Sequence, residues 1–190
     1  MSAGTESEVL ADLRYSRGAM WFHWIIAALI VANLCLGFFH EGFGREAGRS
    51  MIFFHKSSGM TILALSIARL FWRLGHKPPP FDARLAQWEV LGARTGHYLF
   101  YVFMIVLPLT GWLMTSASGR PTNYFGLFTI GNLPVARGEE IHEFWEEAHE
   151  LLGWGMVALL AVHIAGALKH AYEGHGYMIG RMAPWLYRRR

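Results

Sequence analysis

Four apolar segments dominate the sequence, and each approaches the roughly 20 residues that an α-helix needs to cross a lipid bilayer. They cover residues 20–39, 53–72, 97–117 and 148–170. Of the 190 residues, 53% are hydrophobic and 16% are charged. A soluble domain of this length rarely combines 8 Trp and 13 Phe with several apolar runs near membrane length. The sequence therefore predicts an all-α integral membrane protein built as a bundle of four transmembrane helices.

Breaks between these segments define the expected connections. The second segment is the most polar, but Lys56 and Arg69 lie near its ends, where long side chains can snorkel to the interface. Pro108 should kink the third segment. The connections are expected to be a short Gly-rich turn at 41–50, a proline break and an amphipathic interfacial stretch at 75–94, and a longer loop at 118–140.

Residues 1–14 are predicted to form a disordered cytoplasmic extension, followed by one membrane domain at 15–190. The first nineteen residues are polar and contain three acids. Because no basic region leads into an apolar run with a small-residue cleavage site, we expect no removable signal peptide.

Basic residues give the expected orientation. With the N-terminus in the cytoplasm, twelve of the 17 Lys and Arg fall on the cytoplasmic side. This bias follows the positive-inside rule and predicts a multi-pass protein of the bacterial inner (cytoplasmic) membrane with both termini in the cytoplasm. The same topology explains the sequence pI of about 9.2, so we expect no nucleic-acid partner.

Histidine is the predicted metal-binding residue type. Cys35 is the single cysteine, and no C-x-x-C-H motif occurs, which excludes an internal disulfide and covalently attached haem. Any metal must therefore be held by other side chains, and the chain has 10 histidines.

Helical spacing sorts four of these histidines into two pairs. His149 and His163 are fourteen residues apart, so they lie within about 40° of one helix face and about 21 Å apart along the axis. The first segment runs outward and the second inward, which places His23 at the depth of His163 and His55 at the depth of His149. Two histidine pairs at two depths are the arrangement that two bis-histidine haems require.

The remaining histidines leave alternatives open. His97 can hydrogen-bond a haem propionate or a quinone carbonyl, or simply lie at the membrane interface. His170 competes with His163 for the inner position, and His142 shares a face with His149 but lies outside the bilayer.

Glycines of the predicted helices leave two alternatives open. Four glycines, namely Gly59, Gly153, Gly155 and Gly166, either leave room for porphyrin edges or serve ordinary helix packing. No carboxylate occurs mid-membrane, which disfavours a proton pump and a histidine-based metal permease, because transport paths usually contain acids.

Four stretches of the sequence together resemble the bacterial cytochrome b561 family, which is related to the b-type cytochrome subunits of nickel–iron hydrogenases. They are YSRGAMWFHW (15–24), FFHKSSG (53–59), GHYLFYVFMIVLPLTGW (96–112) and HELLGW…AVHIAGALKHAY (149–172). The resemblance covers nearly the whole chain after residue 14. It implies a four-helix membrane bundle with two haems b between the helices. Carried over by motif, His23 and His163 are the axial iron ligands of the inner haem, and His55 and His149 those of the outer haem.

The resemblance also implies electron exchange with the quinone pool. We therefore expect a quinone-linked oxidoreductase in contact with membrane lipid, and oxidation of superoxide with ubiquinone as acceptor is a candidate activity. The alternative is a haem-bearing membrane anchor, like a hydrogenase b subunit, that relays electrons to or from a soluble redox partner. Lys56, directly after His55, either meets a haem propionate or snorkels.

Overall fold

Helices make up almost all of the structure. The computed structural model describes residues 14–81, 85–175 and 177–185, so the predicted N-terminal extension lies outside the described residues except for Arg14. The long helices are α2 (Arg17–Phe39), α3 (Gly44–Gly75), α4 (Gln87–Ala117) and α5 (Glu139–His170). Three short helical pieces follow α2 or α5, namely the 3-10 turn η1 (His40–Phe43), the π-helical η2 (Ala171–His175) and α6 (Tyr177–Gly180).

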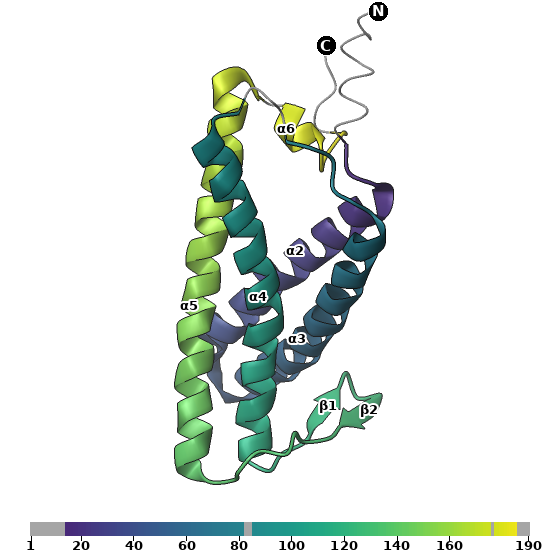
Figure 1. Ribbon diagram of the computed structural model, residues 1–190. Helices are drawn as coiled ribbons and strands as arrows, with labels where there is room; N and C mark the ends of the chain where they lie inside the picture. The colour runs from purple at the N-terminus through teal and green to yellow at the C-terminus, as the bar shows by residue number, and fades with distance from the viewer. Residues whose placement is uncertain (1–13, 82–84, 176, 186–190) are drawn as a thin grey trace, which may run out of the picture.

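The long helices form two neighbouring pairs (Figure 1). Helices α4 and α5 run antiparallel along their lengths, while α2 and α3 fold back on each other through η1. Toward the end where α2 begins and α6 lies, α2 and α3 diverge from α4 and α5 (Figure 1). We call this end the inner end and the opposite end, near η1, the outer end.

Three helical segments of the described chain are long and apolar enough to cross a membrane. They cover 17–75, 87–117 and 139–173, and the first contains both α2 and α3. Many of their apolar side chains are exposed on the bundle surface, including Ile25, Val162 and Leu168. Exposed apolar surface along whole helices suits contact with lipid, so the prediction of a helical membrane protein agrees with the structure.

A layer of buried apolar side chains crosses the middle of the bundle. Each long helix contributes one residue that follows a histidine of the same helix by seven positions, and these residues are Ile30, Ile62, Met104 and Met156. The histidines are His23, His55, His97 and His149 respectively. Seven helical residues span about 10 Å. Because neighbouring helices run in opposite directions, the apolar layer separates an inner histidine level from an outer one.

Helix boundaries differ from the sequence prediction at the outer turn and before α4. The expected turn at 41–50 is confined to η1, and α3 already begins at Gly44. The interfacial stretch expected at 75–94 ends as helix, because α4 begins at Gln87. Glycines at 42, 44 and 48 suggested a longer turn, but Gly48 lies within α3, where an added Cβ would be 2.7 Å from the His40 carbonyl oxygen.

A small hairpin interrupts the loop expected at 118–140. Strands β1 (Thr122–Tyr124) and β2 (Phe128–Ile130) pair antiparallel. Their turn places Phe125 and Gly126 at φ 49° and 77°, and the N–H of Leu127 donates to the Tyr124 carbonyl. Such consecutive positive φ values define a tight hairpin turn, which glycine adopts without steric cost.

The inner end is tied together by the segment after α6. Arg181 is 7% exposed, and its guanidinium donates to the carbonyl oxygens of Pro79 and Pro80 at 3.0 and 2.8 Å. The N–H of Tyr15 donates to the Arg181 carbonyl, and the Trp24 indole donates to the carbonyl of Met182 at 2.8 Å. These bonds hold the C-terminal segment against the start of α2 and the connection between α3 and α4.

Removing the Ser57 hydroxyl should loosen the hairpin. Ser57 of α3 is fully buried, accepts the N–H of Phe125 at 3.0 Å and lies 3.1 Å from the Asn123 carbonyl oxygen. Ser57→Ala leaves the Phe125 N–H without this acceptor, so we expect a loss of about 1–3 kcal/mol of stability. Thermal unfolding in detergent measures it. Ser50→Ala is the control, because the exposed Ser50 hydroxyl bonds to Glu46 within the same helix, and equal effects of both variants would contradict the expectation.

Candidate functional site

The structure brings together both histidine pairs that the sequence predicted. At the inner level the ring centroids of His23 in α2 and His163 in α5 are 6.3 Å apart, with an interplanar angle of 64°. At the outer level the centroids of His55 in α3 and His149 in α5 are 5.9 Å apart, at 89°. Helix α5 thus contributes one ring to each level, and α2 and α3 each contribute one partner.

Backbone carbonyls orient both rings of the outer pair. Nδ1 of His55 is 3.0 Å from the Asn33 carbonyl oxygen of α2, and Nδ1 of His149 is 3.1 Å from the Leu107 carbonyl oxygen of α4. A carbonyl can only accept, so each Nδ1 carries the proton. A neutral imidazole protonated at Nδ1 has its lone pair on Nε2, which is the state that a metal ligand needs. The Thr110 hydroxyl also lies 3.1 Å from Nδ1 of His149.

Two glycines make room for the outer rings. A Cβ added to Gly37 of α2 would lie 2.9 Å from Cε1 of His55, and one added to Gly111 of α4 would lie 3.0 Å from Cε1 of His149. The close approach lets each ring reach the carbonyl that orients it. Sequence analysis missed both glycines, because their role depends on which helix each ring faces.

Aromatic and cationic side chains surround the inner pair. The ring centroids of Phe100 and His97, both in α4, lie 5.1 and 6.3 Å from that of His163. The Arg69 guanidinium of α3 is close enough to His23 and His163 to interact electrostatically with both. Within the described residues, no backbone carbonyl accepts a hydrogen bond from either inner ring. Packing, rather than hydrogen bonding, therefore positions these two imidazoles.

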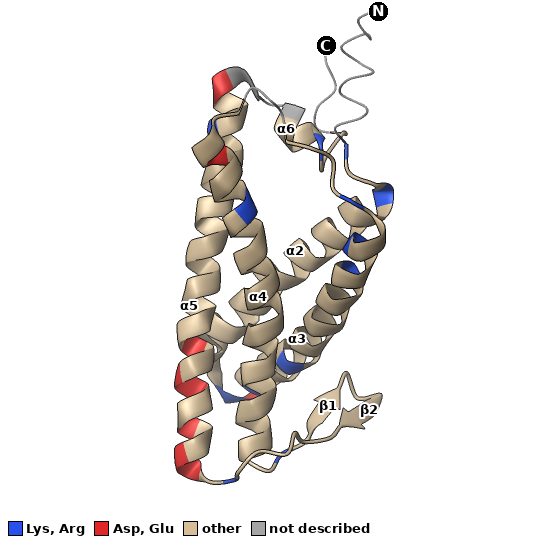
Figure 2. Ribbon diagram, in the orientation of Figure 1, with Lys and Arg blue, Asp and Glu red and all other residues tan. Residues whose placement is uncertain are grey.

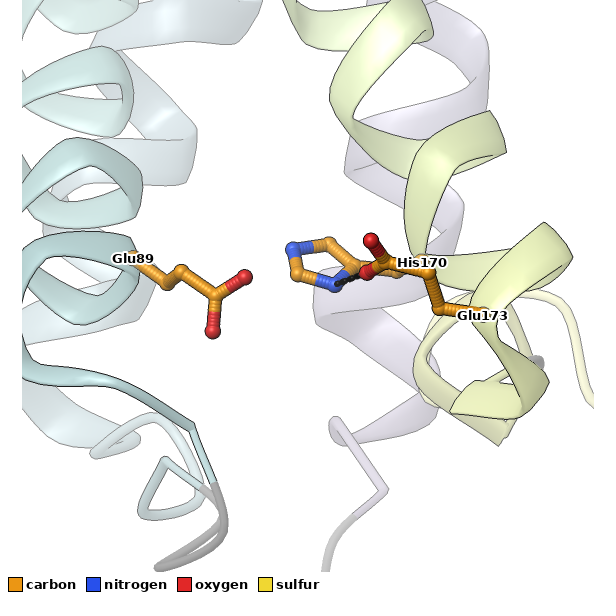
Figure 3. Close-up of side chains that lie close together, drawn as sticks. All are labelled: Glu89, His170 and Glu173. Atoms are coloured by element: carbon orange, nitrogen blue, oxygen red, sulfur yellow. Dashed lines mark ion pairs between the residues drawn. The ribbon is translucent and has the colours of Figure 1, made fainter.

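His170, the alternative to His163 as partner of His23, lies beside two carboxylates instead. It lies beside Glu173 and Glu89 (Figure 3), with Nδ1 3.9 Å from the Glu173 carboxylate. The Lys169 ammonium binds both carboxylates at 3.0 Å and supplies a positive charge between them. We assign this cluster a structural role, since it joins the start of α4 to the end of α5. His163 is the residue that the structure places opposite His23.

His142 belongs to the outer end of α5, as expected. Its Nδ1 is 2.9 Å from the Met114 carbonyl oxygen, and its Nε2 is 3.9 Å from the Glu146 carboxylate. The ring therefore joins α5 to the end of α4. It lies one heptad from His149, which is the α5 histidine that faces His55.

Most of the glycines that could leave room for a porphyrin edge face other side chains. A Cβ on Gly155 would meet the Phe103 ring at 2.7 Å, one on Gly153 the Phe38 ring at 3.5 Å, and one on Gly59 the Asn33 amide at 3.6 Å. These contacts favour the helix-packing alternative. An added Cβ on Gly166 would have no neighbour within 4 Å in the described structure.

Charge is distributed unequally between the two ends of the bundle. Figure 2 shows the acidic residues of α5 gathered at its outer end. They are Glu139, Glu140, Glu143, Glu146, Glu147 and Glu150. Basic residues at the start of α2, at the end of α3 and in the C-terminal segment lie toward the inner end (Figure 2), whereas Arg45, Arg49 and Lys56 belong to the outer half of α3. The two histidine levels therefore lie in different electrostatic surroundings.

Gly37→Ala should disturb the outer pair specifically. The new methyl group would overlap the His55 ring at 2.9 Å, so the ring must move away from the Asn33 carbonyl. We expect a loss of about 1–3 kcal/mol, typical of overpacking, measured as a lower midpoint of thermal unfolding in detergent. Gly92→Ala in α4 is the matched control, because an added Cβ there would have no neighbour within 4 Å in the described structure. If the Gly37→Ala protein is as stable as the control, the His55 ring can move without cost and the close contact with Gly37 is not required.

Comparison with known proteins finds relatives over nearly the whole chain. The sequence matches the family of prokaryotic cytochrome b561 over residues 14–185. It is 27% identical over 175 residues to cytochrome b561 homolog 2 of Escherichia coli (strain K12), covering 89% of this chain and 90% of that protein. It is 25% identical over 177 residues to the probable superoxide oxidase CybB of Yersinia pestis, covering 90% and 96%. The chain therefore belongs to the bacterial cytochrome b561 family, whose members are b-type haem proteins of membrane electron transfer.

Proposed function

We propose that the protein holds two haems b, one between His23 and His163 and one between His55 and His149, and exchanges electrons with the quinone pool. Support comes first from spacing. Two imidazoles that bind one iron from opposite sides, each at about 2 Å, have ring centroids about 6 Å apart. The observed separations are 6.3 and 5.9 Å. This match at two levels is the observation that carries the proposal.

The protonation of the outer rings also suits haem iron. Because Nδ1 of His55 and of His149 donates to a carbonyl, Nε2 of each ring is the available donor atom. Such hydrogen bonds fix the ring orientation and raise the basicity of the ligand. The apolar layer between the levels keeps water from the interior of the bundle.

A haem held by the two imidazoles of each pair would supply reversible one-electron chemistry. The helices hold the two sites about 21 Å apart along α5, one toward each membrane surface. Two such sites match the two electrons that reduce one ubiquinone to ubiquinol. The protein would thus act as a path for electrons across the apolar core of the membrane.

The proposed orientation places the inner end in the cytoplasm of a bacterium and the outer end on the far side of its inner membrane. This rests on the excess of Lys and Arg in the segments at the inner end. Residues 1–14 would then be a cytoplasmic extension of the domain formed by 15–190.

Superoxide is the proposed electron donor at the outer end. One relative is named a probable superoxide oxidase, at 25% identity. Oxidation of two superoxide anions to dioxygen releases two electrons, which reduce one ubiquinone with two protons. The acidic end of α5 repels an anion, so superoxide would reach the outer pair from the side of Lys56, which follows His55 in α3.

His149→Ala should remove one haem and leave the other. The variant deletes an axial ligand of the outer site only, so the pyridine haemochrome assay should fall from two haems per polypeptide to about one. His142→Ala, in the same helix and one heptad earlier, is the control and should keep two. Two haems retained in the His149→Ala protein would contradict the ligand assignment.

Purified protein in vesicles that contain ubiquinone should form ubiquinol when superoxide is generated outside. We expect one ubiquinol for every two superoxide anions consumed, and loss of the reaction in the His149→Ala variant. Reduction of the haems by ubiquinol without any reaction with superoxide would contradict superoxide as donor. Failure to exchange electrons with ubiquinol at all would favour the alternative of an anchor that serves a soluble partner.

A further inference from the structure

Two arginines of α3 lie over one aromatic ring near the inner histidine pair. The guanidinium carbons of Arg69 and Arg73, one helical turn apart, are 5.5 and 5.4 Å from the ring centroid of Tyr101 in α4. Tyr101 follows His97 by one turn in α4, and the His97 ring lies 6.3 Å from that of His163. The two cations are therefore held at the edge of the inner site.

Helical register places Arg69 at the depth of the inner pair. Arg69 follows His55 by fourteen residues in α3, just as His163 follows His149 in α5. Both helices run from the outer to the inner end, so α3 presents a guanidinium where α5 presents an imidazole. Arg73 lies one turn closer to the inner surface.

Within the described residues, no carboxylate forms an ion pair with either arginine. Among the described residues, the carboxylates in ion pairs are those of Glu89, Glu146 and Glu173, and they pair with Lys169 or with histidines. Two like charges one turn apart near the membrane interior are unfavourable unless an anion joins them. The arrangement therefore calls for a negatively charged group that the described chain does not supply.

A buried hydroxyl on the same side of α3 is also unsatisfied. Ser66 precedes Arg69 by three residues and Arg73 by seven, which places the three side chains on one stripe of the helix. Ser66 is fully buried, and its Oγ has no hydrogen-bond partner within the described structure. Buried polar atoms are normally hydrogen-bonded, so this stripe is suited to a polar ligand.

We propose that Arg69 and Arg73 bind the two propionate carboxylates of a haem held between His23 and His163. This inference rests on the proposed function. A haem b carries two propionate carboxylates on neighbouring pyrroles at one edge of its ring, and a guanidinium binds a carboxylate through two parallel N–H donors. The pair of arginines thus matches the group in number and in charge, at the edge of the inner site. At the outer site the cation that α3 places beside the histidine is Lys56, whose ammonium lacks the two parallel N–H donors of a guanidinium, so the two haems would be held differently.

Haem loss to excess apomyoglobin tests the binding role. In His149→Ala protein, which should retain the inner haem alone, adding Arg69→Gln or Arg73→Gln should accelerate haem loss roughly 10- to 100-fold, as expected for a lost charge-assisted hydrogen bond. Arg94→Gln is the control, because Arg94 lies over the ring of Phe81 at the same end of the bundle. Unchanged rates in both test variants would overturn the proposal.

Haem dimethyl ester separates carboxylate binding from a structural role. The ester has no propionate charge, so protein reconstituted with it should lose it at the same rate with or without Arg69 and Arg73. Equal acceleration for haem and ester would overturn the proposal, because the arginines would then act on the fold.

Redox titration of protein with both haems gives an independent readout. Arg69→Gln removes a positive charge that favours the reduced iron, so one transition should move to lower potential while the other stays in place. Arg69→Lys keeps the charge and should largely keep that potential. A movement of neither transition would overturn the proposal, whereas purified protein without any haem would overturn the proposed function instead.

Discussion

The fourteen-residue separation of the two histidines in α5 is the constraint on which the rest of the bundle depends. Since the helical rise is fixed, this separation sets the distance between the inner and outer levels. The other long helices follow the same spacing, because each places a buried apolar residue seven positions, or half of this separation, after its own histidine. The result is a polar, an apolar and again a polar layer, stacked along the bundle axis. The apolar layer separates the two levels.

The depth of each histidine along the bundle could be predicted from the sequence, whereas the direction in which each side chain points could not. Rise per residue and helix direction were enough to pair His23 with His163 and His55 with His149, and the structure places these rings together. The supporting contacts were missed. Gly37 and Gly111 are important because each faces a histidine of another helix. The rotation of each helix about its axis, which decides this, is set by packing and cannot be read from the sequence. The hairpin was missed because strands of three residues are too short to show a period of two.

The two levels differ in what holds their imidazoles. At the outer level, α2 and α4 approach α3 and α5 closely through Gly37 and Gly111, so backbone carbonyls reach the rings. At the inner level the helix pairs diverge (Figure 1), and aromatic rings and guanidinium groups fill the space instead. A hydrogen bond from an imidazole ligand to a carbonyl lowers the reduction potential of the iron, whereas a nearby positive charge raises it. Two chemically identical haems in these sites would therefore have unequal affinities for an electron.

Helix α5 contributes an imidazole to both levels, while α2 and α3 each contribute an imidazole to one. A rigid rotation of α5 about its axis would turn His149 and His163 by the same angle, so ligand geometry would change at both depths together. Displacement of α2 or α3 would move the imidazole that it contributes at a single level. Strain applied at one membrane surface could therefore change the ligand geometry at the opposite one through α5, without any change in the layer of apolar side chains that lies between.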